Sequence, residues 1–169
     1  VEMIAARAGF GDVMADGVAR MSQRFGPLTD EFNMTVKGQE IPMHEPRLKY
    51  SVGIGYAVAP VGADHQMNVH DTTYTTDNDS IWRVNSALPP ELQIKPMPAQ
   101  MLNEDKMRLF YLELNFAHFQ DCALNCQFYP YNYEQYAELL TGVTGCEYTI
   151  ADILAVGERA QTLCRLFNL

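Results

Sequence analysis

The sequence is short of basic residues and of long apolar runs, and each shortage excludes a class of protein. Twelve Lys and Arg stand against twenty-one Asp and Glu, which gives a formal charge of −9. Such a charge repels phosphate backbones and anionic lipid, so we expect neither nucleic acid nor a membrane surface as a partner. No apolar run approaches the ~18 residues of a spanning helix. With 47% hydrophobic and 20% charged residues, the chain is typical of a soluble globular protein, and we expect it in the cytoplasm.

Common catalytic motifs are missing as well. The chain has no GxSxG nucleophile elbow. Gly53-Ile54-Gly55 lacks the third glycine and the helix start of a nucleotide-binding loop. A length of 169 residues suits one domain, or two small ones sharing a core, and needs no disulfide to fold. The chain begins and ends within apolar, helix-like patterns, so we expect it to be a piece of a longer polypeptide.

Apolar residues at helical spacing dominate the sequence and predict a mainly α, multihelical fold. Helices are expected at 1–8, 13–26, 47–59, 101–119, 133–140 and 150–167, a short strand at 32–36, and irregular structure at 62–85. A strand remains an alternative for 47–59. Prolines between 89 and 98 mark a connection. We therefore expect a helical region with a histidine-bearing loop at 1–88, a Pro-rich connection at 89–98 and a C-terminal helical region at 99–169.

Three features refine this helical pattern. The segment 101–119 is apolar on more than one face, which indicates a buried helix or one that faces a missing partner. Thr149 and Asp152 fit a capping box at the start of the last helix. Gly142 is expected to end the helix before it.

His118, Cys122 and Cys126 would share one face of a continuous helix and could supply three metal ligands. A single CxxxC pair is weak evidence, since zinc sites usually show two paired motifs. The alternative is that the cysteines are small buried residues and that His118 caps a helix end.

His44, His65 and His70 lie in or beside loops. His65 follows a Gly-containing turn directly, which places an imidazole well for meeting a substrate. His70 next to Asp71 is a competing candidate, because a carboxylate partner adjoins it in the chain. The ordinary alternative for each is a surface histidine bonded to a nearby carboxylate.

Several stretches together resemble the tungsten-containing aldehyde:ferredoxin oxidoreductase family. They occur in the family's order and leave residues 66–97 poorly matched. The matching stretches are Ile4-Ala5-Ala6-Arg7 through Gly11-Asp12 to Asp16-Gly17-Val18, Val36-Lys37-Gly38-Gln39-Glu40-Ile41-Pro42 with Glu45-Pro46-Arg47, Tyr56-Ala57 with Gly62-Ala63-Asp64-His65, Gly157-Glu158-Arg159, and Arg165-Leu166-Phe167-Asn168.

The resemblance implies a chain from the family's C-terminal helical domains. The cofactors would be a tungsten (or molybdenum) bis-pterin and a [4Fe-4S] cluster, both complete only in the full-length parent. Aldehydes would be oxidised to carboxylic acids, with ferredoxin as electron acceptor and the remaining domains of the parent as partners. A homo-oligomer is compatible with this picture. The alternatives are a related aryl-CoA ring reductase subunit, or a non-catalytic helical interaction domain that docks through 101–119.

The resemblance also assigns site residues. His65 matches the histidine that the family places beside the metal for proton transfer. The family's Asp-x-x-Gly-Leu-Cys pattern matches Asp121 and Cys126, while Leu124-Asn125 stands in place of Gly-Leu. Asp121, Asn125 and Cys126 are therefore expected to contact the cofactors, with Cys126 as the remote cluster ligand.

Overall fold

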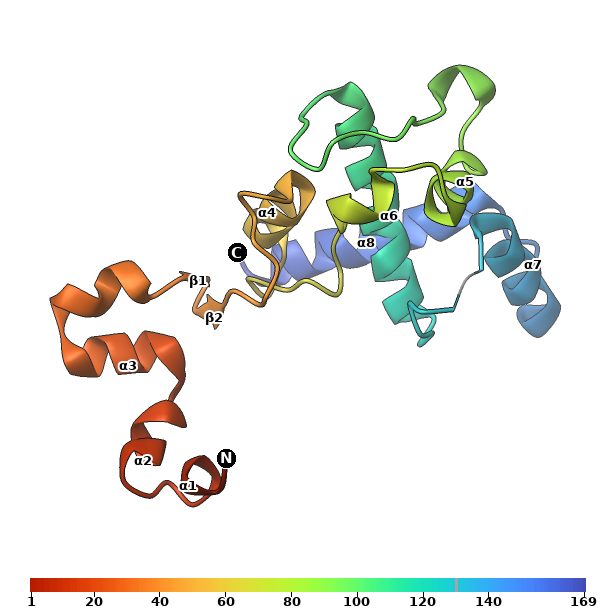
Figure 1. Ribbon diagram of the computed structural model, residues 1–169. Coiled ribbons are helices and arrows are strands. Elements are labelled where there is room, and N and C mark those ends of the chain that lie inside the picture. The colour runs from red at the N-terminus through yellow and green to blue at the C-terminus, as the bar shows by residue number, and fades with distance from the viewer. Residues whose placement is uncertain (130) are drawn as a thin grey trace.

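A computed structural model describes residues 1–129 and 131–169, of which more than half lie in helices and very few in strands (Figure 1). The α-helices are α1 (Glu2–Ala5), α2 (Phe10–Met14), α3 (Gly17–Phe25), α4 (Tyr50–Val58), α5 (Asp79–Asn85), α6 (Glu104–Cys122), α7 (Tyr133–Thr144) and α8 (Ile150–Phe167). Short 3-10 helices are η1 (Pro27–Phe32), η2 (Asp71–Tyr74) and η3 (Pro90–Leu92). The antiparallel strands β1 (Thr35–Val36) and β2 (Gln39–Glu40) form a small hairpin. The prediction of a mainly α, multihelical fold is confirmed.

Helices α6 and α8 cross at the centre of the molecule, with α5 and α7 beside them (Figure 1). The crossing is close at Gly157, where an added Cβ would lie 1.8 Å from the carbonyl oxygen of Asn115. Glycine is therefore required for the two backbones to meet. The predicted capping box of Thr149 and Asp152 begins α8 as expected.

Three clusters of buried apolar residues form the core. The first contains Val69, Tyr74, Ile81, Val84, Ile94, Met97, Leu109 and Leu112. The second contains Phe116, Phe119, Tyr133, Tyr136, Ala137 and Ile153. The third contains Val52, Tyr56 and Ala63. The first cluster includes Ile94 and Met97 of the Pro-rich segment as well as residues on both sides of it. The segment therefore packs into the core. The division of the chain at 89–98 stays a prediction.

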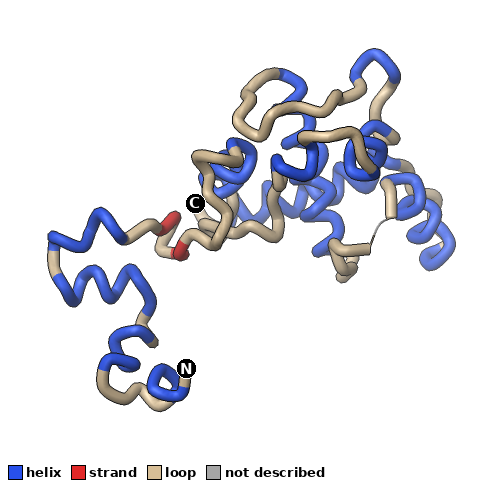
Figure 2. The backbone as a smooth tube through the Cα atoms, in the orientation of Figure 1, coloured by secondary structure: helices blue, strands red, loops and turns tan. Residues whose placement is uncertain are grey.

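Residues 1–34, which we call the arm, stand apart from the rest of the molecule (Figure 2). The arm contains α1, α2, α3 and η1 and buries only Gly11, Val13 and Ser22. It joins the body, residues 35–169, through the hairpin, where the Val18 N–H donates to the Glu40 carboxylate.

The structure corrects several expected boundaries. The helix expected at 13–26 is divided into α2 and α3, because Gly17 adopts a φ of +80°. The expected strand is reduced to Thr35–Val36. The segment 62–85, expected to be irregular, contains α5, which Asn78 caps through its side chain. Helix α7 ends at Gly145, with a φ of +74°, and not at Gly142.

Helix α6 is buried by this chain itself. Leu109 and Leu112 belong to the first core cluster and Phe116 and Phe119 to the second, and Leu109 is fully buried. Met107 and Tyr111 stay exposed. Of the two interpretations of 101–119, the structure therefore favours a buried helix, and the alternative of an interaction domain loses most of the surface on which it depended. None of the described helices is both long and apolar enough to cross a membrane.

Candidate active site

The loop that carries His65 runs from the end of α4 to η2 and is fixed at both ends. At its start, Gly62 has a φ of +111°, and an added Cβ would lie 2.3 Å from the Val36 carbonyl oxygen. At its end, Asp71 accepts hydrogen bonds from the backbone N–H groups of Ser51 and Val52, at 2.9 and 3.3 Å. The loop is thus held against both the hairpin and the N-terminus of α4.

A buried ion pair completes the second attachment. Lys106 Nζ lies 2.5 Å from Asp71 Oδ1, and both side chains are 0% exposed. Lys106 belongs to α6, so Asp71 joins α4, η2 and α6 at one point. Its carboxylate is fully used there, so the predicted pairing of His70 with Asp71 does not form.

The three loop histidines, which the sequence left as separate candidates, form one cluster. The ring centroids of His44 and His65 lie 4.7 Å apart, those of His44 and His70 lie 4.5 Å apart, and those of His65 and His70 lie 6.0 Å apart. Lys49 Nζ lies 3.2 Å from His44 Nδ1 and 3.5 Å from His70 Nδ1. Lys49 was not predicted, and nothing in its sequence context marks it.

Two glutamines connect His65 to the loop that carries Cys126. The Gln127 side-chain amide donates to Gln66 Oε1, and Gln66 Nε2 lies 2.8 Å from His65 Nε2. Since Gln66 uses its oxygen as the acceptor for Gln127, its amide nitrogen donates to His65. His65 Nε2 is then the acceptor and Nδ1 carries the proton, an assignment made from this network.

Asp121, Asn125 and Cys126, predicted from the resemblance, do lie together. With Gln66 they line a small pocket of about 220 Å³. The pKa of Asp121 is raised by burial, an effect that His118 opposes and Asp64 of the histidine loop reinforces. The two predicted parts of the site are therefore neighbours, although more than fifty residues separate them in sequence.

The Cys126 loop contains a left-handed turn, although its sequence lacks the family's glycine at that position. Leu124, at the place of the family's glycine, has a φ of +54° and is 94% exposed. The Cys126 N–H donates to Asn125 Oδ1 at 2.8 Å, and Asn125 Nδ2 donates to the Tyr136 hydroxyl at 3.1 Å. The loop thus presents an exposed thiol on an anchored turn, which fits a single ligand to an iron–sulfur cluster.

The face expected to join His118, Cys122 and Cys126 is not formed. Helix α6 ends at Cys122, and Cys126 lies beyond the turn. His118 is buried and its Nδ1 bonds to the Leu114 carbonyl at 2.8 Å. Within residues 1–129 and 131–169, no group of three or more His, Cys, Asp or Glu side chains is arranged to hold a metal ion.

A second cavity, of about 370 Å³, adjoins the histidine cluster and is lined by His70, Gln66 and Gln127 among others. Its floor holds Glu113, which accepts from Arg83 Nη2 at 2.5 Å and from the Tyr133 hydroxyl at 2.8 Å. This network brings together residues far apart in sequence, so no local pattern could have predicted it.

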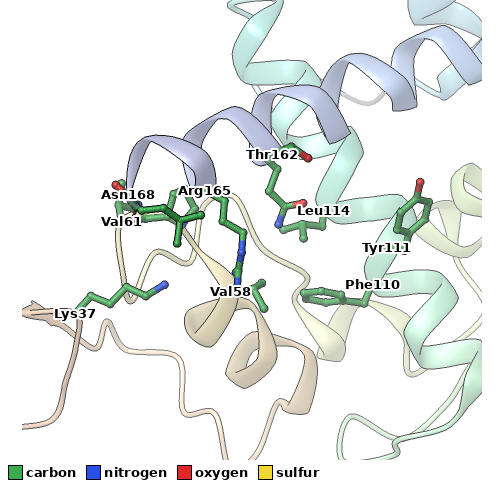
Figure 3. Close-up of a pocket in the computed structure, with 12 residues that line it drawn as sticks. Lys37, Val58, Val61, Phe110, Tyr111, Leu114, Thr162, Arg165 and Asn168 are labelled. Atoms are coloured by element: carbon green, nitrogen blue, oxygen red, sulfur yellow. Dashed lines mark hydrogen bonds between the residues drawn. The ribbon is translucent and has the colours of Figure 1, made fainter.

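A larger groove, of about 750 Å³, lies between α4, α6 and α8 and holds none of the predicted site residues. Arg165 of α8 extends toward Val58, with Phe110 and Leu114 of α6 on the other wall (Figure 3). Near it, Asn168 Nδ2 donates to the Pro60 carbonyl at 2.7 Å, which ties the start of the histidine loop to the end of α8.

Comparison with known proteins shows the family to which the chain belongs. The family described as "Aldehyde ferredoxin oxidoreductase, domains 2 & 3" matches residues 1–169. Proteins named tungsten-containing aldehyde ferredoxin oxidoreductase are similar to this chain over its whole length: 31% identical in Pyrococcus furiosus, 29% in Pyrococcus horikoshii and 28% in Thermococcus kodakarensis. The chain spans 25–26% of the length of these relatives. No solved structure matches it significantly. The chain belongs to the aldehyde ferredoxin oxidoreductase family, in the region of its domains 2 and 3.

Proposed function

We propose that this chain is part of a longer tungsten (or molybdenum) bis-pterin oxidoreductase that oxidises aldehydes to carboxylic acids and passes the electrons to ferredoxin. The observation that carries the proposal is the link between His65 and the Cys126 loop through Gln66 and Gln127. These are the two parts of the site that the family resemblance assigns to proton transfer and to cofactor contact.

His65 acts in this proposal as the general acid–base. Its Nε2 is the acceptor nitrogen and faces Gln66, which also lines the pocket with Asp121 and Cys126. A neutral imidazole takes up and returns a proton near neutral pH. The metal, when bound, supplies Lewis acidity and oxygen-atom chemistry, and the cluster carries the electrons.

Cys126 would supply one thiolate to the [4Fe-4S] cluster, and other parts of the complete protein would supply the remaining three. Asp121 and Asn125 border the same pocket and would contact the pterin or the cluster. All four cysteines of the chain are free and exposed, which suits a reducing compartment such as the cytoplasm. A homo-oligomer is compatible with this assignment.

The first experiment compares two cysteines in the complete protein. Cys126→Ser should disturb the cluster, since a hydroxyl is a poor replacement for a thiolate on iron, whereas Cys122→Ser should leave it intact. Iron content and the EPR spectrum are the measurements. Wild-type values in both variants would refute the assignment of Cys126, and equal loss in both would indicate a site that uses the CxxxC pair.

The second experiment tests the histidine. His65→Asn should lower turnover by ~10²–10⁴-fold, the usual contribution of a positioned general acid–base, with metal content unchanged. His70→Asn is the matched variant. If His70→Asn shows the large loss and His65→Asn does not, the acid–base is His70.

Metal analysis tests the function as a whole. The complete protein should contain tungsten or molybdenum near one per chain and about four irons. Residues 1–169 alone should be helical by circular dichroism but hold no stoichiometric metal, because a cluster bound by one protein thiolate should not persist. A brown, monomeric preparation of residues 1–169 with bound iron would contradict the proposal.

A further inference from the structure

Lys49 makes an unusual pair of contacts for a lysine at the start of a helix. Its Nζ approaches the Nδ1 atoms of His44 and His70, at 3.2 and 3.5 Å, and the salt bridges of the described residues do not include it. An ammonium group has three donors and no acceptor. Both Nδ1 atoms must therefore accept from Lys49, and both rings carry their proton on Nε2.

The second ring nitrogen of His70 is also committed. It lies 2.9 Å from the carbonyl oxygen of His65, so its Nε2–H donates there. His70 is thus bonded at both nitrogens, to Lys49 on one side and to the His65 backbone on the other. His65 differs: its Nε2 accepts from the Gln66 amide, and Lys49 does not bond to its ring.

Burial and the nearby positive groups also favour the neutral forms of His44 and His70. Burial lowers the pKa of His44, and His70, Lys49 and His65 lower it further. Burial also lowers the pKa of His70; its bond to the His65 backbone and the charge of Asp71 oppose that shift, while Lys49 and His65 reinforce it.

The nearby carboxylates do not form ion pairs with Lys49, because they bond to other groups. Asp71 is paired with Lys106, and Glu45 with Arg47. Asp64 accepts the backbone N–H of Gln66 at 2.6 Å. The positive charge of Lys49 therefore acts directly on the two imidazoles that it contacts.

We propose that Lys49 is a positioning residue that holds His44 and His70 as neutral, Nε2-protonated imidazoles and leaves His65 as the one histidine of the cluster that exchanges protons during turnover. This inference rests on the proposed function. His70 in turn bonds to the His65 backbone. Lys49 therefore helps to place His65 and also keeps the other two histidines from acting as the base. Without Lys49, His44 and His70 would each have a free Nδ1 and could compete with His65 for the proton.

The test removes the charge of Lys49 in the complete protein. In Lys49→Met, the pH midpoints of His44 and His70 should both move upward. Exchange of the imidazole C2 hydrogen, followed by mass spectrometry, reports each histidine separately and needs neither metal nor activity. Lys49→Arg should keep the wild-type midpoints, and Lys95→Met, an exposed lysine elsewhere, is the matched control.

Unchanged midpoints for His44 and His70 in Lys49→Met would overturn the inference, and so would an equal shift in Lys95→Met. If Lys49→Met does not fold, as judged by circular dichroism, Lys49→Gln keeps a donor without the charge and should give the same upward shift. Absence of that shift in a folded Lys49→Gln protein would also overturn it. If the midpoints shift but the protein contains neither tungsten nor molybdenum, the role of Lys49 toward the two imidazoles is supported and the proposed aldehyde oxidation is refuted.

Discussion

The arm and the body of this chain are both helical, but they are held together differently. The helices of the arm are 4, 5 and 9 residues long, below the ~12–15 at which isolated helices become marginally stable in water. The arm leaves most of its large apolar side chains exposed, namely Met3, Phe10, Met14, Phe25, Leu28, Phe32 and Met34. The body contains the three core clusters and longer helices, of 19 residues in α6 and 18 in α8.

The difference shows that local pattern and tertiary burial contribute separately to this fold. The arm is held mainly by turns, short-range hydrogen bonds and its contact with the hairpin, whereas the body depends on contacts between distant segments. We therefore expect amide hydrogen exchange to be much faster in residues 1–34 than in α6 and α8. Matched changes in the two regions, or in two parts of the body, test how far this contrast extends.

The largest effect should come from the buried ion pair. Lys106→Met leaves the Asp71 carboxylate buried without its cation, a loss that typically costs about 3–5 kcal/mol. The matched change in the arm is Arg7→Met, which removes exposed ion pairs to Asp12 and Asp16 and should lower the stability far less, because solvent screens exposed pairs. Urea unfolding of both variants measures the difference. Similar losses for the two would show that the body does not depend on this buried pair.

A smaller loss is expected where α6 and α8 meet. Gly157→Val would drive side-chain atoms into the Asn115 carbonyl and should cost about 1–3 kcal/mol, as overpacking usually does. Gly142→Ala is the control, because an added Cβ there meets no atom within 4 Å. It should stabilise α7 by about 0.5–1 kcal/mol, since alanine favours helix over glycine. Thermal unfolding would distinguish the two, and a neutral Gly157→Val would mean that the helices can separate without cost.

The Cys126 loop is a strained part of the otherwise well-packed body. Leu124→Gly removes the cost of a left-handed φ on a leucine, roughly 1–2 kcal/mol, and sacrifices little packing because Leu124 is exposed. The added freedom of glycine in the unfolded chain offsets part of this gain. A net stabilisation of about 0.5–1 kcal/mol is expected by urea unfolding, with wild-type iron content in the complete protein. Destabilisation would mean that the turn is not left-handed at this position.

The helical periodicity of the sequence was sufficient to predict α6, α7 and α8 and the capping box at Thr149, because these features depend on nearby residues. Helix α4 packs closely against the loop that follows it: an added Cβ at Gly55 would lie 1.9 Å from the Asn68 side-chain amide. Helix α5 was missed, since its apolar residues are few and its start depends on the side chain of Asn78.

The site was predictable only where a loop histidine or one of the family's motifs marks it. His65, Asp121 and Cys126 were identified from separate short motifs. That they lie close together depends on how α4 and α6 pack. Lys49 and Gln66 could not be predicted, because a lysine or glutamine acquires its role here only from the groups that the fold brings to it.

The smallest expected effect is on the pH dependence of stability. It should differ between the two regions, because the arm contains no histidine. The pKa values of His44 and His70 are lowered in the folded chain. An unfolded histidine has a pKa near 6.5, so just below that pH the unfolded chain binds more protons than the folded one. Stability contributed by these neutral imidazoles is therefore present above about pH 6.5 and is lost as the pH falls toward their folded values. Amide exchange in α4, corrected for the intrinsic effect of pH, should rise between pH 7.5 and 5.5, whereas exchange in the arm should not. Replacing both histidines with glutamine should abolish the rise in α4, and a rise that persists would place its origin outside the cluster.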